Sequence, residues 1–122
     1  MGLIKRFAAY GFADLVGEKF RALLQQVGRN RYRRQDVYDL AILSHLPRSS
    51  EDEVSILESL RLKSRSRHIE PHSNSLNDEE VKGRAAADYH TLRDEVQGDL
   101  PDFEIAYAQV VAFFRGLPWG DD

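Results

Sequence analysis

The chain has 122 residues, of which 42% are hydrophobic and 30% are charged, and it contains no cysteine. This composition predicts one domain with a hydrophobic core, and it excludes disulfides, thiolate metal sites and cysteine nucleophiles. No run of about 18 apolar residues occurs, so we expect a cytoplasmic protein with no membrane partner. Residues 1–68 carry 13 Lys and Arg against 8 Asp and Glu, whereas residues 69–122 carry 4 against 12. The two parts therefore face different partners or face each other.

The first third of the chain predicts an arm followed by two helices. Residues 1–11 mix apolar and basic side chains without a period, which fits a short arm or a single unpaired strand. Apolar residues then recur at three- and four-residue spacing from Phe12 to Val27, which predicts an amphipathic helix that Gly28 ends. A second helix over 35–46 is apolar nearly all round, so we expect it to be buried on most sides.

The remaining residues predict three more helices. Ser50 and Glu53 form the pattern of a capping box at the start of a helix over 50–67. A second such box opens a helix over 77–96, which Gly98 follows. Pro101 fits the first turn of a last helix that reaches Leu117. We therefore predict an all-α domain over 12–122, a bundle of about five helices.

Three charged residues on the two first helices are candidates for chemistry. Lys19 lies beside the apolar stripe of its helix, where a lysine commonly lays its stem on apolar surface and lifts its amine to water. Asp36 and Asp39 are three residues apart and point along one side of the next helix. One interpretation is that they only favour the helix start; the other is that they lie beside an apolar face and need a partner.

The loop between these helices is rich in arginine. Arg29, Arg31, Arg33 and Arg34 fall within six residues, with Tyr32 among them. Guanidinium groups bind two phosphate oxygens at once, and an aromatic ring can stack on a base, so one interpretation is an RNA-binding or phosphate-binding loop. The alternative is a solvated loop whose arginines pair with the two aspartates that follow.

No metal site is expected from the histidines or the carboxylates. None of the histidines shows the spacing of a metal-binding motif; they are His45, His68, His72 and His90. Phosphate-binding glycine motifs and the glycine-flanked serine of hydrolases are also absent from the sequence.

Two stretches in this order resemble the last two motifs of the AbiEii/AbiGii-type nucleotidyltransferase toxin family. They are ADLVGEKFRALLQQ at 13–26 and RNRYRRQDVYDLAIL at 29–43, and DLPDFEIAYAQVVAFFRGLPW at 99–119 is similar to the C-terminal end of such proteins. The family is similar to DNA polymerase β-type nucleotidyltransferases. The resemblance implies the C-terminal helical half of such an enzyme, which transfers a nucleotide from an NTP, with Mg²⁺, to an acceptor such as tRNA. It also implies a type IV toxin–antitoxin pair in phage defence, with an antitoxin as partner.

The resemblance also implies roles for individual residues. Lys19 takes the place of the lysine that contacts nucleotide phosphate, and Asp36 takes the place of the catalytic aspartate. Asp39 matches a second, more structural aspartate, and Glu18 matches the acidic neighbour of the lysine. Gln35 stands where the family has Arg. The adjacent arginines would then serve as phosphate ligands; the residues so assigned are Arg31, Arg33 and Arg34.

The Gly-Ser and Asp-x-Asp motifs that bind NTP and metal in this family do not occur in the sequence. The acidic run Glu51-Asp52-Glu53 opens a helix and is not a metal pair on a strand. We therefore expect the chain to be inactive alone and to need a missing N-terminal half or a separate chain. Residues 1–11 would then represent the last strand of that missing half. The alternative is a non-catalytic helical module that binds protein or RNA, with exposed apolar surface that favours a homo-oligomer.

Overall fold

The computed structural model describes residues 11–96 and 98–120. This part of the chain holds five α-helices, two short 3-10 helices and no strand, which confirms the prediction of an all-α bundle. The expected arm or strand over 1–11 lies outside the described residues apart from Gly11. The elements are α2 (Phe12–Arg29), α3 (Arg34–Leu43), α4 (Ser50–Arg65), η1 (Ser75–Asn77), α5 (Glu79–Ala86), η2 (Tyr89–Asp94) and α6 (Phe103–Arg115).

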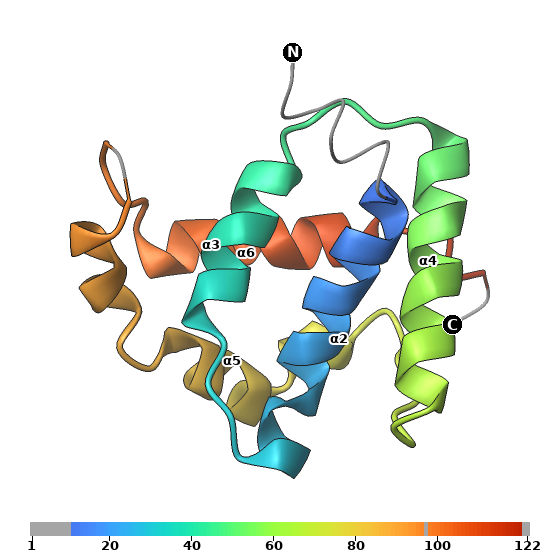
Figure 1. The fold of residues 1–122 in the computed structure, drawn as a ribbon, viewed down its shortest axis with the longest axis horizontal. Coiled ribbons are helices and arrows are strands. Elements are labelled where there is room, and N and C mark those ends of the chain that lie inside the picture. Colours follow the sequence, from blue (N-terminus) through green and yellow to red (C-terminus); the bar gives the residue numbers. More distant parts are fainter. Residues whose placement is uncertain (1–10, 97, 121–122) are drawn as a thin grey trace.

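Helix α2 is the central element of the bundle. It packs along α4 on one side and against α3 and α5 on the other, while α6 crosses behind α3 and α2 (Figure 1). Phe20 of α2 is fully buried, and its ring packs edge-to-face on Phe113 and Phe114 of α6 at centroid distances of 5.3 and 4.9 Å. These contacts place the core where α2, α4 and α6 meet.

Helices α2 and α4 approach closely because Gly17 has no side chain. A Cβ atom on Gly17 would lie 2.8 Å from the hydroxyl oxygen of Ser59 and 3.1 Å from the backbone nitrogen of Leu60. The same Ser59 hydroxyl donates a hydrogen bond of 2.7 Å to Asp14. The glycine and the polar pair together fix how α2 and α4 pack.

The end of α2 differs from the prediction. The helix continues through Gly28 and ends at Asn30, which adopts the left-handed conformation with φ 52° and donates its backbone N–H to carbonyls of the last turn. Asparagine tolerates this conformation and therefore replaces the expected glycine stop. Val27, assigned to the apolar stripe, is exposed, whereas Gln26 is completely buried.

The predicted helix starts at Phe12 and Ser50 are confirmed, but the capping residues of the later helices differ from those expected. The capping box of α4 uses Ser49 and Asp52, not Ser50 and Glu53. Asp78 caps α5 by accepting hydrogen bonds from two N–H groups of the first turn, and Asp102, one residue after Pro101, caps α6. In each case the capping side chain belongs to the residue directly before the first helical turn, from where its oxygen accepts from free N–H groups of that turn.

The fourth predicted helix is also shorter than expected. α5 ends at Ala86, the chain turns through Asp88 in the left-handed region with φ 58°, and the 3-10 helix η2 follows. Two apolar residues of the predicted stripe, Tyr89 and Leu92, nevertheless lie in the core, although they now belong to η2. Apolar spacing alone cannot distinguish one long helix from two short ones in such a segment.

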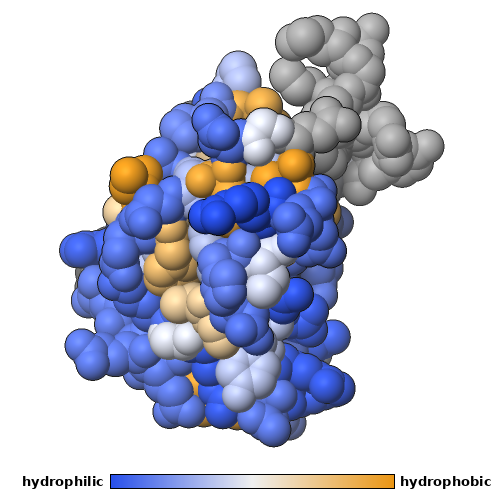
Figure 2. Space-filling model, turned by 90° about the vertical axis from the view of Figure 1, so that its left-hand side faces the viewer, coloured by the Kyte–Doolittle hydropathy of each residue, from blue (hydrophilic) through white to orange (hydrophobic). Residues whose placement is uncertain are grey.

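Helix α3 is less buried than its apolar composition predicted. Val37 and Leu40 are fully buried, but Ile42 is exposed on the other side of the helix. The face of the molecule drawn in Figure 2 is largely hydrophilic, with smaller apolar patches between polar side chains. No helix in the described ranges is long and apolar enough to cross a membrane.

The Gly17 contact predicts opposite effects for two glycine-to-alanine substitutions. Gly17→Ala should lower the free energy of unfolding by about 1–3 kcal/mol, because the new methyl group pushes α4 away from α2. Gly83→Ala, inside α5 where a Cβ atom would meet no other atom within 4 Å, should raise it by roughly 0.5–1 kcal/mol through helix propensity. Urea denaturation followed by circular dichroism measures both, and a stabilised Gly17→Ala variant would contradict the close packing.

Candidate functional site

Lys19 lies between the two aspartates of α3. Its Nζ atom is 3.1 Å from Oδ1 of Asp36 and 2.8 Å from Oδ2 of Asp39, and it donates a hydrogen bond to each. The Lys19 side chain is 19% exposed and that of Asp36 is 13% exposed, so the cluster is largely shielded from water. The structure thus brings together three of the predicted site residues at the contact between α2 and α3.

This arrangement corrects two expectations. The Lys19 amine does not extend into open water but is held by carboxylates, and the aspartates pair with Lys19 rather than with the loop arginines. Asp39 also accepts a hydrogen bond of 3.0 Å from Gln35, one helical turn earlier. The helix-start explanation is therefore incomplete, because both aspartates have a specific partner across the helix interface.

Electrostatics keep Lys19 protonated. Burial works to lower the pKa of Lys19, but the hydrogen bonds and charges of Asp39 and Asp36 together outweigh burial and raise it above its ordinary value. The cluster therefore holds one ammonium and two carboxylates and carries a net negative charge. An ammonium has three protons, so one proton of Lys19 remains after the two aspartates are satisfied.

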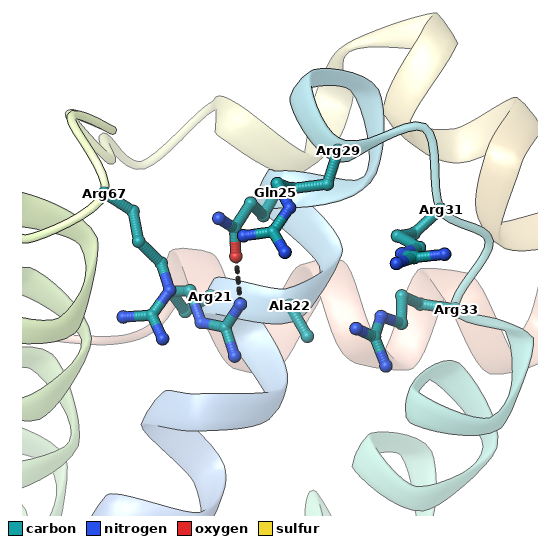
Figure 3. A pocket seen from close by; sticks show the side chains of 7 residues that line it. All are labelled: Arg21, Ala22, Gln25, Arg29, Arg31, Arg33 and Arg67. Atoms are coloured by element: carbon teal, nitrogen blue, oxygen red, sulfur yellow. Dashed lines mark hydrogen bonds between the residues drawn. The ribbon is translucent and has the colours of Figure 1, made fainter.

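A second cluster surrounds a small hollow beside α2. The hollow has a volume of about 150 Å³, and five of its seven lining residues are arginines. Figure 3 shows them coming from three parts of the chain, with Arg67 from the segment after α4 and the others from α2 and the loop that follows it. The lining residues are Arg21, Ala22, Gln25, Arg29, Arg31, Arg33 and Arg67.

Arg21 is the most buried of these arginines, with 7% of its surface exposed. Its guanidinium donates to the side chains of Gln25 and Glu18, but its Nε atom is buried and has no hydrogen-bond partner in the part of the chain that the structure describes. Burial lowers the pKa of Arg21, and the like charges of Arg67 and Arg33 lower it further. The hollow is therefore a site of unbalanced positive charge.

The structure brings together only part of the predicted phosphate-binding set. Arg31 and Arg33 line the hollow, whereas Lys19 belongs to the aspartate cluster, and Arg34 does not line the hollow. The Nε atom of Arg34 is buried without a partner among the described residues. Glu18, predicted as a supporting acid, forms an ion pair with Arg21, which lines the arginine hollow.

Sequence reasoning missed Arg21, Gln25 and Arg67 as site residues. Arg21, Gln25 and Arg29 follow each other at four-residue spacing, a signal that places them on one face of α2. Arg67 belongs to a basic run that is typical of a solvated helix face, and only the packing of α4 along α2 brings it to the hollow. Local spacing could have found the first three members but not the last.

A comparison with protein families shows the class of protein to which the chain belongs. The family model described as nucleotidyl transferase AbiEii toxin, type IV TA system, matches residues 5–111. The chain belongs to this family. Neither the curated proteins nor the solved structures compared with the chain gave a match. The AbiEii match includes both the Lys19 cluster and the arginine hollow, and the family's activity is nucleotidyl transfer.

The described part of this AbiEii chain does not fit a magnesium ion. No group of three or more His, Asp or Glu side chains that could hold a metal occurs within 11–96 or 98–120. Asp36 and Asp39 share a partner, but that partner is the Lys19 ammonium, which binds both carboxylates. A divalent cation there would have to displace a like charge, so we assign it no role at these residues.

The shared ammonium predicts strong coupling within the cluster. Lys19→Met should lower the free energy of unfolding by about 1–3 kcal/mol, because two partly buried carboxylates then lose their common counter-charge. Adding Asp39→Asn should restore part of that loss by removing one negative charge. A double-mutant cycle from urea denaturation measures the coupling; additive effects of the two substitutions would contradict the shared ion pair.

The raised pKa of Lys19 predicts how this contribution depends on pH. It is fully present below the unfolded-state pKa of about 10.4 and is lost as the pH rises through the higher folded-state value. The difference in unfolding free energy between the wild type and Lys19→Met should therefore shrink as the pH rises above about 10.4. Denaturation series across this range test it, and a constant difference would contradict the assigned interaction.

Proposed function

We propose that this chain supplies the phosphate-contacting lysine and the catalytic aspartate for transfer of a nucleotide from an NTP to an acceptor such as tRNA. One observation carries the proposal: Lys19 is held, charged, between Asp36 and Asp39. These residues come from two separate helices and meet in the part of the chain that the AbiEii family model matches. In this proposal each of them has a different task.

Lys19 is oriented to bind a phosphate oxygen. Two of its protons go to the aspartates, and the third is free to donate to an anionic oxygen of the NTP. Because both carboxylates hold the ammonium, little side-chain freedom is lost when phosphate binds. Asp39 is held by Lys19 and by Gln35, so its role is to position the lysine.

Asp36 is the candidate general base. Lys19 engages its Oδ1 atom, and no described residue donates a hydrogen bond to its Oδ2 atom. Oδ2 accepts the proton of the acceptor hydroxyl while that oxygen bonds to the α-phosphorus of the NTP. The bond from the α-phosphorus to the bridging oxygen breaks, and pyrophosphate leaves. Arg31 and Arg33 bind phosphate groups nearby, and Glu18 supports them by holding Arg21.

We further propose that transfer needs a second polypeptide or a further domain with the Gly-Ser and Asp-x-Asp motifs. Neither motif occurs in the sequence. The described residues also form no cluster of three or more His, Asp or Glu side chains that could hold the metal. The proposed setting is cytoplasmic, within a type IV toxin–antitoxin pair with an antitoxin as partner. The family description supports the toxin–antitoxin part of this setting.

Label transfer tests the proposal. The chain alone, with labelled NTP, Mg²⁺ and tRNA, should transfer no label, whereas addition of a family polypeptide that carries the two motifs should restore transfer. In the restored system, Lys19→Ala and Asp36→Ala should each lower the rate by about 100-fold or more, because they remove a charge contact and the proton acceptor.

A matched surface ion pair provides the control. Lys82 and Glu104 lie 2.7 Å apart and are both exposed, so Lys82→Ala and Glu104→Ala should leave the restored rate unchanged. Circular dichroism verifies that every variant is folded. Transfer by the isolated chain would overturn the need for a second component, and unchanged rates in Lys19→Ala or Asp36→Ala would overturn the assigned roles.

A further inference from the structure

Tyr32 presents an aromatic ring to solvent in the loop between α2 and α3. The residue is 55% exposed, and it belongs neither to the hydrophobic core nor to the partly buried residues packed against the core. Single exposed apolar residues are common on protein surfaces, so exposure alone gives Tyr32 no task. Tyr32 differs from an ordinary exposed residue because a charged side chain from another helix lies over its ring.

Arg84 of α5 is that side chain. Its guanidinium carbon Cζ lies 5.2 Å from the centroid of the Tyr32 ring. The guanidinium also donates to the side-chain oxygen of Asn30 at 3.0 Å and to the backbone carbonyl oxygen of Arg31 at 3.4 Å, and its Nε atom lies 3.5 Å from a carboxylate oxygen of Glu80. Arg84 thus ties the two residues before Tyr32 to α5. Because these contacts already order the ring, a ligand that binds on it costs little further side-chain freedom.

The Tyr32 ring keeps a free surface. Arg84 lies over the ring, yet more than half of the tyrosine remains accessible to solvent. A flat aromatic surface of this kind is a platform on which a nucleobase stacks, at about 1–3 kcal/mol per base, and a nearby guanidinium adds a cation–π contribution. In a duplex the faces of a base are covered by neighbouring base pairs, so stacking on a side chain selects a base that is unpaired.

Positive charge and the candidate general base lie close to Tyr32 along the chain. Arg31 and Arg33, its two neighbours, both line the arginine hollow (Figure 3). Such arginines attract the phosphates of a nucleic-acid strand, because each nucleotide carries a negative charge. Asp36 is four residues after Tyr32, so the two Cα atoms lie within about 14 Å of each other. A base on Tyr32 is therefore near enough to Asp36 to guide the reacting end of its strand.

We propose that Tyr32 binds the RNA acceptor of the transfer reaction by stacking on an unpaired base close to the reacting end, and that Arg84 positions its ring for that task. The inference rests on the proposed transfer to an acceptor such as tRNA and adds a requirement to it: the acceptor presents a single-stranded base at the site. Stacking tolerates every base, since each has a π face, so the requirement concerns the pairing of the strand and not its sequence. The arginines contribute salt-dependent affinity, and the ring contributes the preference for unpaired bases.

Binding of short RNAs by the full chain tests the stacking. Fluorescence anisotropy compares a labelled, unstructured single strand with a strand of the same length that lacks all bases and with the same strand in a blunt duplex. Tyr32→Ala should weaken binding of the intact single strand at least about fivefold, which corresponds to about 1 kcal/mol. It should leave binding of the abasic strand and of the duplex unchanged, because neither offers a free base. Tyr32→Phe keeps the ring and should bind like the wild type.

Leu62→Ala provides the matched control. Leu62 is 64% exposed and lies on α4, so its truncation removes comparable apolar surface elsewhere and should not change binding. Equal losses in Tyr32→Ala and Leu62→Ala would overturn the assignment, and so would an equal loss of Tyr32→Ala on the intact and the abasic strand. Failure of the wild type to bind the intact single strand would overturn it as well.

A double-mutant cycle tests the positioning role of Arg84. Arg84→Met removes the guanidinium but keeps a long unbranched side chain, and should weaken single-strand binding. Combined with Tyr32→Ala it should add no further loss, because Arg84 acts through the ring. Additive losses would show that Arg84 contacts the RNA itself and would overturn its positioning role. Circular dichroism verifies that every variant is folded.

The transfer reaction gives a separate readout. In the restored system, Tyr32→Ala should raise KM for an acceptor with a single-stranded end, while KM for the NTP stays unchanged. A raised KM for the NTP with an unchanged KM for the acceptor would overturn the assignment. The two proposals fail separately: absence of restored transfer would overturn the proposed function, whereas the RNA-binding series still decides whether Tyr32 stacks on a base.

Discussion

The buried amide of Gln26 is the interaction on which the site depends. Its Nε2 atom donates to the carbonyl oxygens of Leu23 at 2.9 Å and Val81 at 3.1 Å, and its Oε1 atom accepts from the backbone N–H of Arg33 at 2.8 Å. The residue is completely buried, so these groups have no water to replace a lost partner. The amide therefore joins α2, α5 and the start of α3, and so fixes where Asp36 faces Lys19.

Two clusters of charged side chains, the Lys19 cluster and the arginine hollow, lie along α2. The Lys19 cluster is compact and internally paired, whereas in the arginine hollow only Arg21 has an ion-pair partner among the described residues. They are within electrostatic reach, because the charge of Asp36 acts to raise the pKa of Arg21 while neighbouring arginines lower it. One helix thus presents a pre-organised lysine and, from Arg21 onward, a strong attraction for anions.

The sequence predicted which segments form helices better than it predicted where those helices end and which residues they bring together. Apolar spacing identified α2, α3 and α6, and the Lys19 and Asp36 candidates came from helix position and family resemblance. Spacing could not show that Gln26 is buried while Val27 is exposed, because at 100° per residue Val27 falls within the apolar stripe and Gln26 at its flank. It also could not bring Arg67 to the hollow, because that contact depends on the packing of α4 along α2 at Gly17.

The Lys19 ammonium takes the place that a metal ion holds beside the carboxylates of many transferases. In a metal-dependent transferase, carboxylates and a divalent cation compensate each other. Here Lys19 provides that compensation for Asp36 and Asp39, so the pair keeps its geometry without a metal. The carboxylates are then available to orient the lysine and to accept a proton. In the function proposed above, another part of the enzyme supplies the metal and its ligands, and the helical part contributes Lys19, Asp36 and Asp39, whose ion pairs are already formed without substrate.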